Sequence, residues 1–311
     1  MAAWQETDKA LASMIRGVPT LVFLAGMAYW LSRSSKTRET TTRATQERGP
    51  KSDSDLPRPS ILKASDHIND HKVHLLLAAT GSVATIKIPN IIQALSHHTN
   101  LSMRVIVTES ASQFLQGQSH EQPSLLEISK LPNVDAVYRD EDEWHEPWVR
   151  GNSILHIELR RWADLMVIAP LSANALAKIA NGFSDTLLYS AVRAWDTAGL
   201  IDTPRPGISL PYGDSPAQKG TEREGKGRKG IIVAPAMNTA MWNHPATTKH
   251  TSVLEGEWNV ENGGWFEVLR PIEKRIACGD TGSGGMKEWT EIVKTIETRL
   301  RLITSREPES K

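Results

Sequence analysis

Short apolar runs alternate with stretches of helical periodicity between residues 71 and 302. The first run, 73–79, is followed by apolar side chains at helical spacing, among them Ile86, Ile91 and Leu95. Runs that are apolar throughout are typical of strands buried on both faces of a sheet. Further strands are predicted at 103–107, 134–138, 165–169, 231–234 and 268–269. The alternation predicts an α/β fold, a Rossmann-like (flavodoxin-like) doubly wound parallel sheet with helices on both faces.

Helical segments separate and follow these strands. They are predicted at 154–162, 172–182, 186–195, 244–255 and 287–302. Ser172 and Asn174 are residue types that favour helix N-termini, which supports the start of the second segment. Before the last helix, the stretch 275–286 holds four glycines. Because glycine disfavours helix interiors and central strands, we expect a mobile loop there.

The first 70 residues lack this alternation and are predicted to form a mostly disordered N-terminal extension. Residues 33–62 are rich in Ser, Thr, Arg, Glu and Pro, a composition that cannot offset its ordering entropy. Residues 17–32 carry no charged side chain, yet they are shorter than the roughly 20 residues that a spanning helix needs. They could be a marginal signal anchor, an interfacial helix or sequence that packs on nothing.

The folded domain is predicted to cover 71–303, with a polar tail at 304–311. Residues 197–229 are rich in Gly, Pro, Lys and Glu, and we expect a mobile surface insertion there. Its basic end, formed by Lys226, Arg228 and Lys229, is interpreted as a solvated tip. A second, smaller insertion is expected around 256–264.

Composition adds exclusions to this picture. The 311 residues carry 36 basic and 36 acidic side chains. The chain therefore lacks the excess of positive charge that would favour binding to a nucleic acid or another polyanion. One cysteine excludes an intrachain disulfide and fits a reducing compartment. We therefore expect a cytoplasmic location, with weak membrane association through 17–32 as the alternative. The chain also lacks the motifs of serine hydrolases, P-loop NTPases and dinucleotide dehydrogenases.

Polar residues stand where the predicted strands end, which is where doubly wound sheets bind ligands. Thr80, Ser110, Ser172 and Asn174 occupy such positions. The turn after the first strand, at Gly81, could seat a phosphate at a helix N-terminus, or it could be an ordinary strand-to-helix turn.

Three further residues have side chains suited to chemistry. Asn238 follows an apolar strand and could orient a carboxylate or an amide. His156 could exchange a proton near neutral pH, or it could be a helix-surface histidine. Cys278 could be a reactive thiol presented by the glycine-rich stretch, or a small buried residue. No histidines and carboxylates show metal-ligand spacing, so the sequence predicts no metal site.

Five segments recur together in a known family. They are 156–164 (HIELRRWAD), 169–174 (APLSAN), 194–196 (AWD), 235–242 (PAMNTAMW) and 277–280 (ACGD). In this order they resemble phosphopantothenoylcysteine decarboxylases of the eukaryotic halotolerance-protein type, within the wider family of flavin-dependent cysteine decarboxylases. The resemblance covers about residues 71–302, interrupted by the two insertions.

The resemblance implies an enzyme, a carboxy-lyase, that binds FMN and converts 4'-phosphopantothenoylcysteine to 4'-phosphopantetheine in coenzyme A biosynthesis. It implies catalytic roles for His156, Asn238 and Cys278. The implied FMN-binding residues are Gly81, Ser82, Val83, Thr108, Glu109, Ser110, Ser172, Ala173, Asn174, Ala175 and Ala236. The implied substrate-binding residues are Asn238, Met241, Arg275, Ala277 and Met286. Ala175 is a departure, because relatives often carry threonine there.

By the same resemblance, flavin oxidation of the cysteine moiety allows CO2 to leave, and the ene-thiolate is then reduced with Cys278 as proton donor. The resemblance also implies a homotrimer, or a heterotrimer with paralogues, in which the histidine of one subunit meets the flavin of its neighbour. Two alternatives are a regulatory, inhibitory subunit of a type-1-like protein phosphatase and a flavoprotein that decarboxylates C-terminal cysteines of peptides. The presence of His156, Asn238 and Cys278 together favours the decarboxylase.

Overall fold

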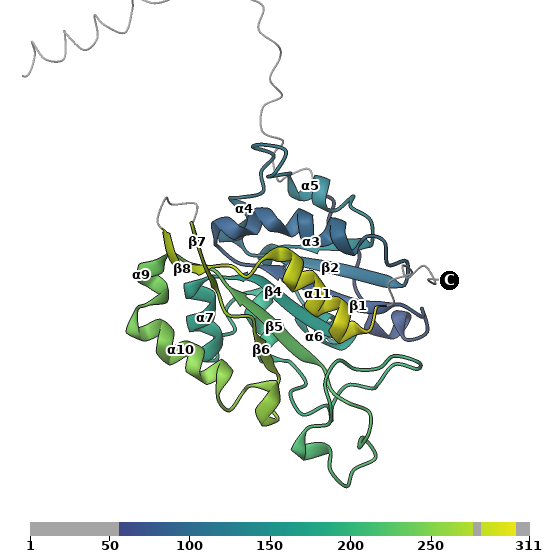
Figure 1. The fold of residues 1–311 in the computed structure, drawn as a ribbon. Helices are drawn as coiled ribbons and strands as arrows, with labels where there is room; N and C mark the ends of the chain where they lie inside the picture. Colours follow the sequence, from purple (N-terminus) through teal and green to yellow (C-terminus); the bar gives the residue numbers. More distant parts are fainter. Residues whose placement is uncertain (1–55, 276–280, 303–311) are drawn as a thin grey trace, which may run out of the picture. The chain divides into compact units, whose positions relative to one another are not determined.

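The computed structural model describes residues 56–275 and 281–302. Its centre is a six-stranded sheet in the order β3-β2-β1-β4-β5-β6 (Figure 1). Each neighbouring pair of strands in this sheet is parallel. The strands are β1 (Val73–Ala79), β2 (Leu101–Val107), β3 (Val134–Tyr138), β4 (Leu165–Leu171), β5 (Gly230–Pro235) and β6 (Phe266–Val268). The predicted doubly wound parallel sheet is therefore confirmed.

The apolar runs form central strands because both faces of the sheet are covered. Within β1, Leu75 and Leu77 belong to one core, while Leu76 and Ala78 belong to a second core on the opposite face. Leu77 pairs with Val105 of β2 on one side and Val167 of β4 on the other, so all three strands are in register at their centres. Alternation of side chains along the strands thus builds two hydrophobic layers from one sequence run.

Helices cover both faces of the sheet. On one face, α3 (Ile88–Leu95) and α11 (Trp289–Leu300) pack together over the strands (Figure 1). The helices of the other core are α6 (Leu155–Trp162), α7 (Ala173–Ala180), α8 (Leu187–Arg193) and α10 (Pro245–Glu255). Short helices are α4 (Glu109–Ser112), α5 (Leu125–Ile128) and α9 (Thr239–Trp242), with 3-10 turns η2 (Ala64–His67), η3 (Val83–Lys87), η4 (Asp140–Asp142), η5 (Pro216–Gln218) and η6 (Val260–Asn262).

A hairpin stands where the sequence predicts a mobile loop. β7 (Ile272–Arg275) and β8 (Thr281–Gly285) pair antiparallel as a separate two-stranded sheet. The glycines of β8 allow this hairpin to lie directly against α9, because a Cβ at Gly282 would come within 2.6 Å of the Thr239 hydroxyl. The loop prediction is therefore wrong for 281–285, and 276–280 lie outside the described residues.

The 197–229 insertion, predicted as a surface segment, is attached to the domain through a buried arginine. Arg205 is buried and donates to the backbone oxygens of His67 and Lys72 at 3.1 and 2.7 Å. It also forms an ion pair of 2.5 Å with Asp164 at the start of β4. A buried charged side chain thus connects the insertion to the sheet through hydrogen bonds and an ion pair. Composition alone does not predict such contacts.

The predicted solvated tip is also wrong for two of its three residues. Arg228 and Lys229 are only 2% and 6% exposed. The Lys229 ammonium donates to the backbone oxygens of Arg160 and Arg161, both at 2.9 Å, at the end of α6. It also pairs with Asp202 at 3.1 Å. Burial lowers the pKa of Lys229, and the Asp202 carboxylate opposes this shift. Of the three, only Lys226 is exposed.

The folded region begins earlier than residue 71. Leu56 and Leu62 are 7% and 3% exposed and belong to the two cores. The N–H of Ala64 donates to the Glu158 carboxylate of α6 at 2.7 Å. Residues 56–70, assigned to the extension on sequence grounds, therefore pack on the domain. The apolar segment 17–32 and the 304–311 tail lie outside the described residues, and no described helix has the length and apolarity needed to cross a bilayer.

Candidate active site

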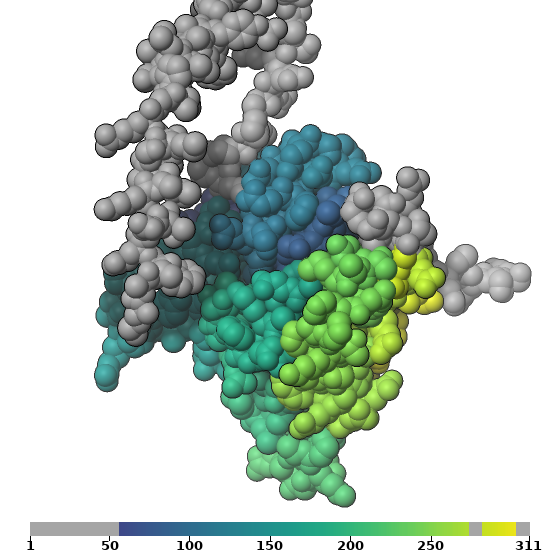
Figure 2. Space-filling model, turned by 90° about the vertical axis from the view of Figure 1, so that its left-hand side faces the viewer, coloured from purple at the N-terminus to yellow at the C-terminus, as the bar shows by residue number. Residues whose placement is uncertain are grey.

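A cavity of about 520 Å³ opens at the carboxyl edge of the sheet. Four regions of the chain meet there: the turn after β1, the start of α4, the start of α7, and the segment after β5 together with β8. Figure 2 views the molecule from this side, where blue, teal and green surfaces from these regions adjoin. The lining residues are Gly81, Ser82, Val83, Ala84, Ile86, Lys87, Ser110, Phe114, Ser172, Ala173, Asn174, Ala236, Met237, Asn238, Met241, Gly284, Gly285 and Met286.

Gly81 allows the turn after β1 to approach α4 closely. A Cβ at this position would lie 2.5 Å from the Ser110 hydroxyl oxygen and 2.7 Å from its Cβ. No other residue fits that distance without displacing Ser110. The glycine therefore lets the turn after β1 and Ser110 of α4 lie side by side in the cavity wall.

Three hydroxyl groups, from Ser82, Ser110 and Ser172, line one part of the cavity. Ser172 caps α7 by accepting from the Ala175 N–H at 3.2 Å, and Ser82 accepts from the Ala84 N–H at 3.4 Å. Helix N-termini present further N–H donors with a favourable dipole. Hydroxyls and N–H groups of this kind suit a phosphate or another anion.

Hydrogen bonds of the Thr80 side chain connect the end of β1 to the end of β4 and the start of α7. The Thr80 hydroxyl donates to the Pro170 oxygen at 2.9 Å and accepts from the Ser172 N–H at 2.7 Å. Thr80 is fully buried, so both bonds are shielded from water. The end of β1 thereby fixes the start of α7 relative to Gly81.

The remaining wall of the cavity is largely apolar. Val83 and Met241 are 43% and 46% exposed, although large apolar side chains usually avoid water. Phe114, Ala236 and Met286 complete this wall. A planar apolar group would cover such side chains, and an anionic tail on the same group could reach the serines.

Asn238 links the cavity to α9. Its side-chain oxygen caps the helix by accepting from the Met241 N–H at 2.8 Å. With the oxygen engaged, the group that the side chain can offer a ligand is the NH2 donor. A carboxylate or a carbonyl oxygen is the complementary ligand atom.

His156 lies in α6, outside the lining of this cavity. Its Nδ1 contacts the carboxylate of Glu143, whose side chain is 3% exposed while that of His156 is 21% exposed. Glu143 belongs to the loop before α6, which also presents the exposed Trp144 and Trp148. The buried carboxylate holds one ring nitrogen and leaves Nε2 for a second partner.

Apart from His156, the predicted site residues separate into three groups. Eleven of them line the cavity: Gly81, Ser82, Val83, Ser110, Ser172, Ala173, Asn174, Ala236, Asn238, Met241 and Met286. Thr108, Glu109 and Ala175 do not line it, and the Thr108 hydroxyl donates to the Ala79 oxygen at 3.3 Å. Arg275 ends β7, and its side chain is not described; Ala277 and Cys278 lie outside the described residues.

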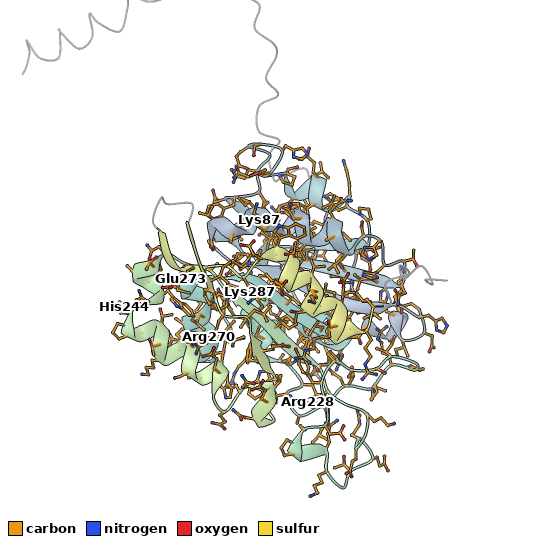
Figure 3. The ribbon with its side chains drawn as sticks, viewed as in Figure 1. Lys87, Arg228, His244, Arg270, Glu273 and Lys287 are labelled. Carbon is orange, nitrogen blue, oxygen red and sulfur yellow. The ribbon has the colours of Figure 1, made fainter. Side chains whose placement is uncertain are left out.

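Sequence reasoning missed several lining residues. Lys87 lies at the junction of η3 and α3, and it is labelled in Figure 3. Phe114 follows α4, and Met237 precedes Asn238. The only sequence evidence that Lys87 lines the cavity is its proximity to the predicted turn at Gly81. For Phe114 it is the position in or near the helix after β2. Glu143 had no signal, because nothing in its loop indicates which carboxylate faces α6.

Comparison with known proteins supplies a family. The family model described as "Flavoprotein" matches residues 63–301. A Saccharomyces cerevisiae relative, "Coenzyme A biosynthesis protein 3", is 35% identical over 283 residues, which is 88% of this chain and 40% of the relative. The chain thus spans less than half the length of that protein. An Arabidopsis thaliana relative, "Probable phosphopantothenoylcysteine decarboxylase", is 39% identical over 225 residues, covering 72% of this chain and 87% of the relative.

Solved structures show the same fold. A PPC decarboxylase mutant complexed with pantothenoylaminoethenethiol matches with a TM-score of 0.53 at 38% identity, covering 73% of this chain and 97% of that chain. The FMN binding protein AtHal3 matches with a TM-score of 0.51 at 38% identity, covering 73% and 95%. Both matches include nearly all of the solved chain.

Proposed function

Because the chain belongs to the flavoprotein family, we propose that it is an FMN-dependent phosphopantothenoylcysteine decarboxylase acting in coenzyme A biosynthesis. The observation that carries the proposal is the cavity at the carboxyl edge, where eleven of the predicted site residues meet. Its relatives are named for this activity and cover most of the described chain. The substrate would be 4'-phosphopantothenoylcysteine, and the products would be CO2 and 4'-phosphopantetheine.

The cavity suits FMN in size and chemistry. A volume of about 520 Å³ falls within the roughly 300–1,000 Å³ usual for small-molecule sites. Ser82, Ser110 and Ser172 would hold the phosphate, and Val83 and Met241 would contact the ring system. Because Gly81 has no side chain, the turn after β1 packs directly on Ser110, and a Cβ there would lie 2.5 Å from the Ser110 hydroxyl oxygen. When bound, FMN supplies the two-electron redox chemistry that makes loss of CO2 feasible.

The protein's own groups would bind and orient the substrate. The Asn238 NH2 would hold the substrate carboxylate while its oxygen remains in the α9 cap. Met286 and the hairpin strand β8 would limit access of water from one side. Cys278, in the segment that joins β7 to β8, would donate a proton to the substrate after CO2 has left, as the resemblance implies.

His156 would act on a neighbouring copy. It lies outside the cavity of its own chain, and its loop exposes Trp144 and Trp148 by 60% and 51%. Large exposed aromatics of this kind favour a protein contact. We therefore propose a homotrimer, or a heterotrimer with paralogues, and sedimentation of the purified chain alone distinguishes a trimer from a monomer. A monomeric chain that is fully active would contradict this arrangement.

The activity can be tested with a variant that preserves the fold. Asn238→Ser keeps a cap oxygen for α9 but removes the amide donor. We expect a yellow protein that releases CO2 from 4'-phosphopantothenoylcysteine, and a roughly 100-fold loss of rate in Asn238→Ser with the flavin retained. Asn90→Ala, on the exposed side of α3, is the matched control and should retain activity. A colourless protein, or one that binds FMN without releasing CO2, would refute the proposal.

Two further variants and one assay address the remaining expectations. Cys278→Ser should release CO2 but fail to yield 4'-phosphopantetheine, because the final proton donor is lost. His156→Gln should abolish decarboxylation and retain flavin. Inhibition of a type-1-like phosphatase by the same preparation would indicate the regulatory alternative, and no described residue specifically favours that activity.

A further inference from the structure

Two neighbouring histidines and a glutamate converge at the edge of the sheet opposite the cavity. His97 and His98 lie in the turn between α3 and β2, and Glu297 lies on α11. Nε2 of His98 is 2.9 Å from a Glu297 carboxylate oxygen, and Nε2 of His97 is 3.8 Å from the same oxygen. The ligand atoms of all three side chains lie within 4.8 Å of one another.

These separations are close to those of a metal centre. Nitrogen and oxygen ligands about 2.1 Å from a tetrahedral zinc ion lie about 3.4 Å apart. The two nitrogen–oxygen distances, 2.9 and 3.8 Å, lie on either side of this value, so small side-chain adjustments would bring the ligand atoms around one ion. Imidazole with carboxylate is a donor set that suits Zn²⁺ and neighbouring transition metals.

The second ring nitrogen of His97 already has a partner. Its Nδ1 lies 2.8 Å from the Ala94 backbone oxygen, so Nδ1 carries a proton, and in the neutral ring Nε2 carries the lone pair. Metal-binding histidines usually make this type of hydrogen bond, which fixes the tautomer and the ring orientation. The lone pair on Nε2 of His97 therefore faces the Glu297 carboxylate, which is also an acceptor, and not a hydrogen-bond donor. A cation between them would resolve this mismatch.

The turn that carries both histidines is held in place by Asn133. One side-chain amide donates to the backbone oxygens of Leu95, Ser96 and His98, at 3.3, 3.3 and 2.9 Å. The side chain of His98 is 1% exposed, and the two imidazole rings lie 3.8 Å apart. The ligands are therefore largely positioned before any ion binds, which lowers the entropic cost of binding.

A second cluster, His67, Asp70 and His74, is less suited to a cation among the described residues. Its ligand atoms are also within 4.8 Å of one another. However, the Arg205 guanidinium lies 3.1 Å from Nε2 of His74 and 3.1 Å from the Asp70 carboxylate. That fixed positive charge occupies the position a metal ion would take.

We propose that His97, His98 and Glu297 form a binding site for Zn²⁺ or a similar transition-metal ion. The sequence predicts no metal site, because adjacent histidines and a glutamate 199 residues beyond His98 show no recognisable ligand spacing. The site joins the end of α3 to α11, the helix that follows the β7–β8 hairpin. Its role is structural, since the cavity lies at the other edge of the sheet, and it is independent of the decarboxylase activity.

The test is a zinc titration of the untagged full chain after EDTA treatment and desalting. Isothermal titration calorimetry should give one Zn²⁺ per chain. His97→Ala and Glu297→Gln should each weaken binding at least tenfold. The side chain of His97 is half exposed, and glutamine can still accept from His98, so both variants should fold. His120→Ala, an exposed histidine elsewhere, and His67→Ala, in the second cluster, should bind zinc like the wild type.

Two further measurements identify the ligands of the ion and its effect on stability. X-ray absorption at the zinc edge should show nitrogen and oxygen ligands without sulfur, which excludes Cys278. Zinc should raise the urea midpoint of the wild type and leave that of His97→Ala unchanged, because the ion binds the folded chain, in which the α3–β2 turn and α11 supply its ligands. Absence of binding at a large excess of zinc, unchanged binding in His97→Ala, or loss of binding in His67→Ala would each overturn the proposal.

Discussion

The carboxylate of Glu143 contacts Nδ1 of His156, although the two residues belong to different elements and Glu143 lies 13 positions earlier. The glutamate side chain is almost fully buried, so water competes little for the imidazole. A buried carboxylate in this position fixes the orientation of the ring and leaves Nε2 as its free nitrogen. The pair is therefore a positioning device for the proposed proton transfer by His156.

Glu143→Gln should slow CO2 release by roughly 10- to 100-fold, because the carboxylate that orients the His156 ring through Nδ1 is lost. Flavin absorbance and the urea midpoint should stay near those of the wild type. Glu143→Asp, which keeps a carboxylate, should recover part of the rate. An unchanged rate in Glu143→Gln would contradict the positioning role.

Gly81→Ala should weaken FMN binding at least tenfold, since the added methyl group would lie 2.5 Å from the Ser110 hydroxyl. Fluorescence quenching of free FMN measures this affinity directly. Gly213→Ala, where an added Cβ would have no atom within 4 Å, is the matched control and should bind FMN like the wild type. An FMN affinity of Gly81→Ala equal to that of Gly213→Ala would contradict this expectation.

Arg205→Ala should destabilise the domain by about 3 kcal/mol, because it leaves the Asp164 carboxylate buried without its ion pair. Urea denaturation followed by tryptophan fluorescence measures the change. Lys226→Ala removes an exposed cation from the same insertion and should have almost no effect. Equal effects of the two substitutions would mean that the insertion is not anchored through Arg205.

Burial raises the pKa of Tyr189 from 10.0 to about 12, with Asp185 and Asp140 adding to the shift. Below pH 10.0 the phenol is neutral in both the folded and the unfolded chain, so it contributes no pH dependence. Between pH 10 and about 12 mainly the unfolded chain loses the proton, which favours unfolding by about 2.7 kcal/mol at most. Tyr189→Phe should therefore lose less stability than the wild type when urea midpoints at about pH 9 and about pH 11 are compared. An equal loss of stability in the two proteins between these pH values would contradict the raised pKa of Tyr189.

Strand position and order of elements were largely predictable from sequence, because burial on both faces leaves an uninterrupted apolar run such as 73–79. The last sheet strand was misplaced: it covers Phe266–Val268 rather than 268–269, since the run is short and a loop follows. The cavity was found because its residues end strands or begin helices. These positions are set by local pattern.

Contacts between distant segments could not be predicted in this way. Arg205 and Lys229 are charged and lie in polar sequence, so composition indicates solvent exposure, yet their partners come from residues 67–72, β4 and α6. The β7–β8 hairpin was missed because its glycines lower strand propensity, and their purpose becomes evident only when α9 lies beside them. Tertiary packing overrode local propensity in both cases.

The α9 cap at Asn238 has an evolutionary consequence. One side chain begins a helix with its oxygen and is proposed to meet the substrate with its nitrogen. A substitution at position 238 would therefore change both the stability of the fold and the selectivity for the substrate, and few substitutions preserve both. Divergence towards new substrates is easier at Met241, whose side chain is partly solvent-facing and makes no cap.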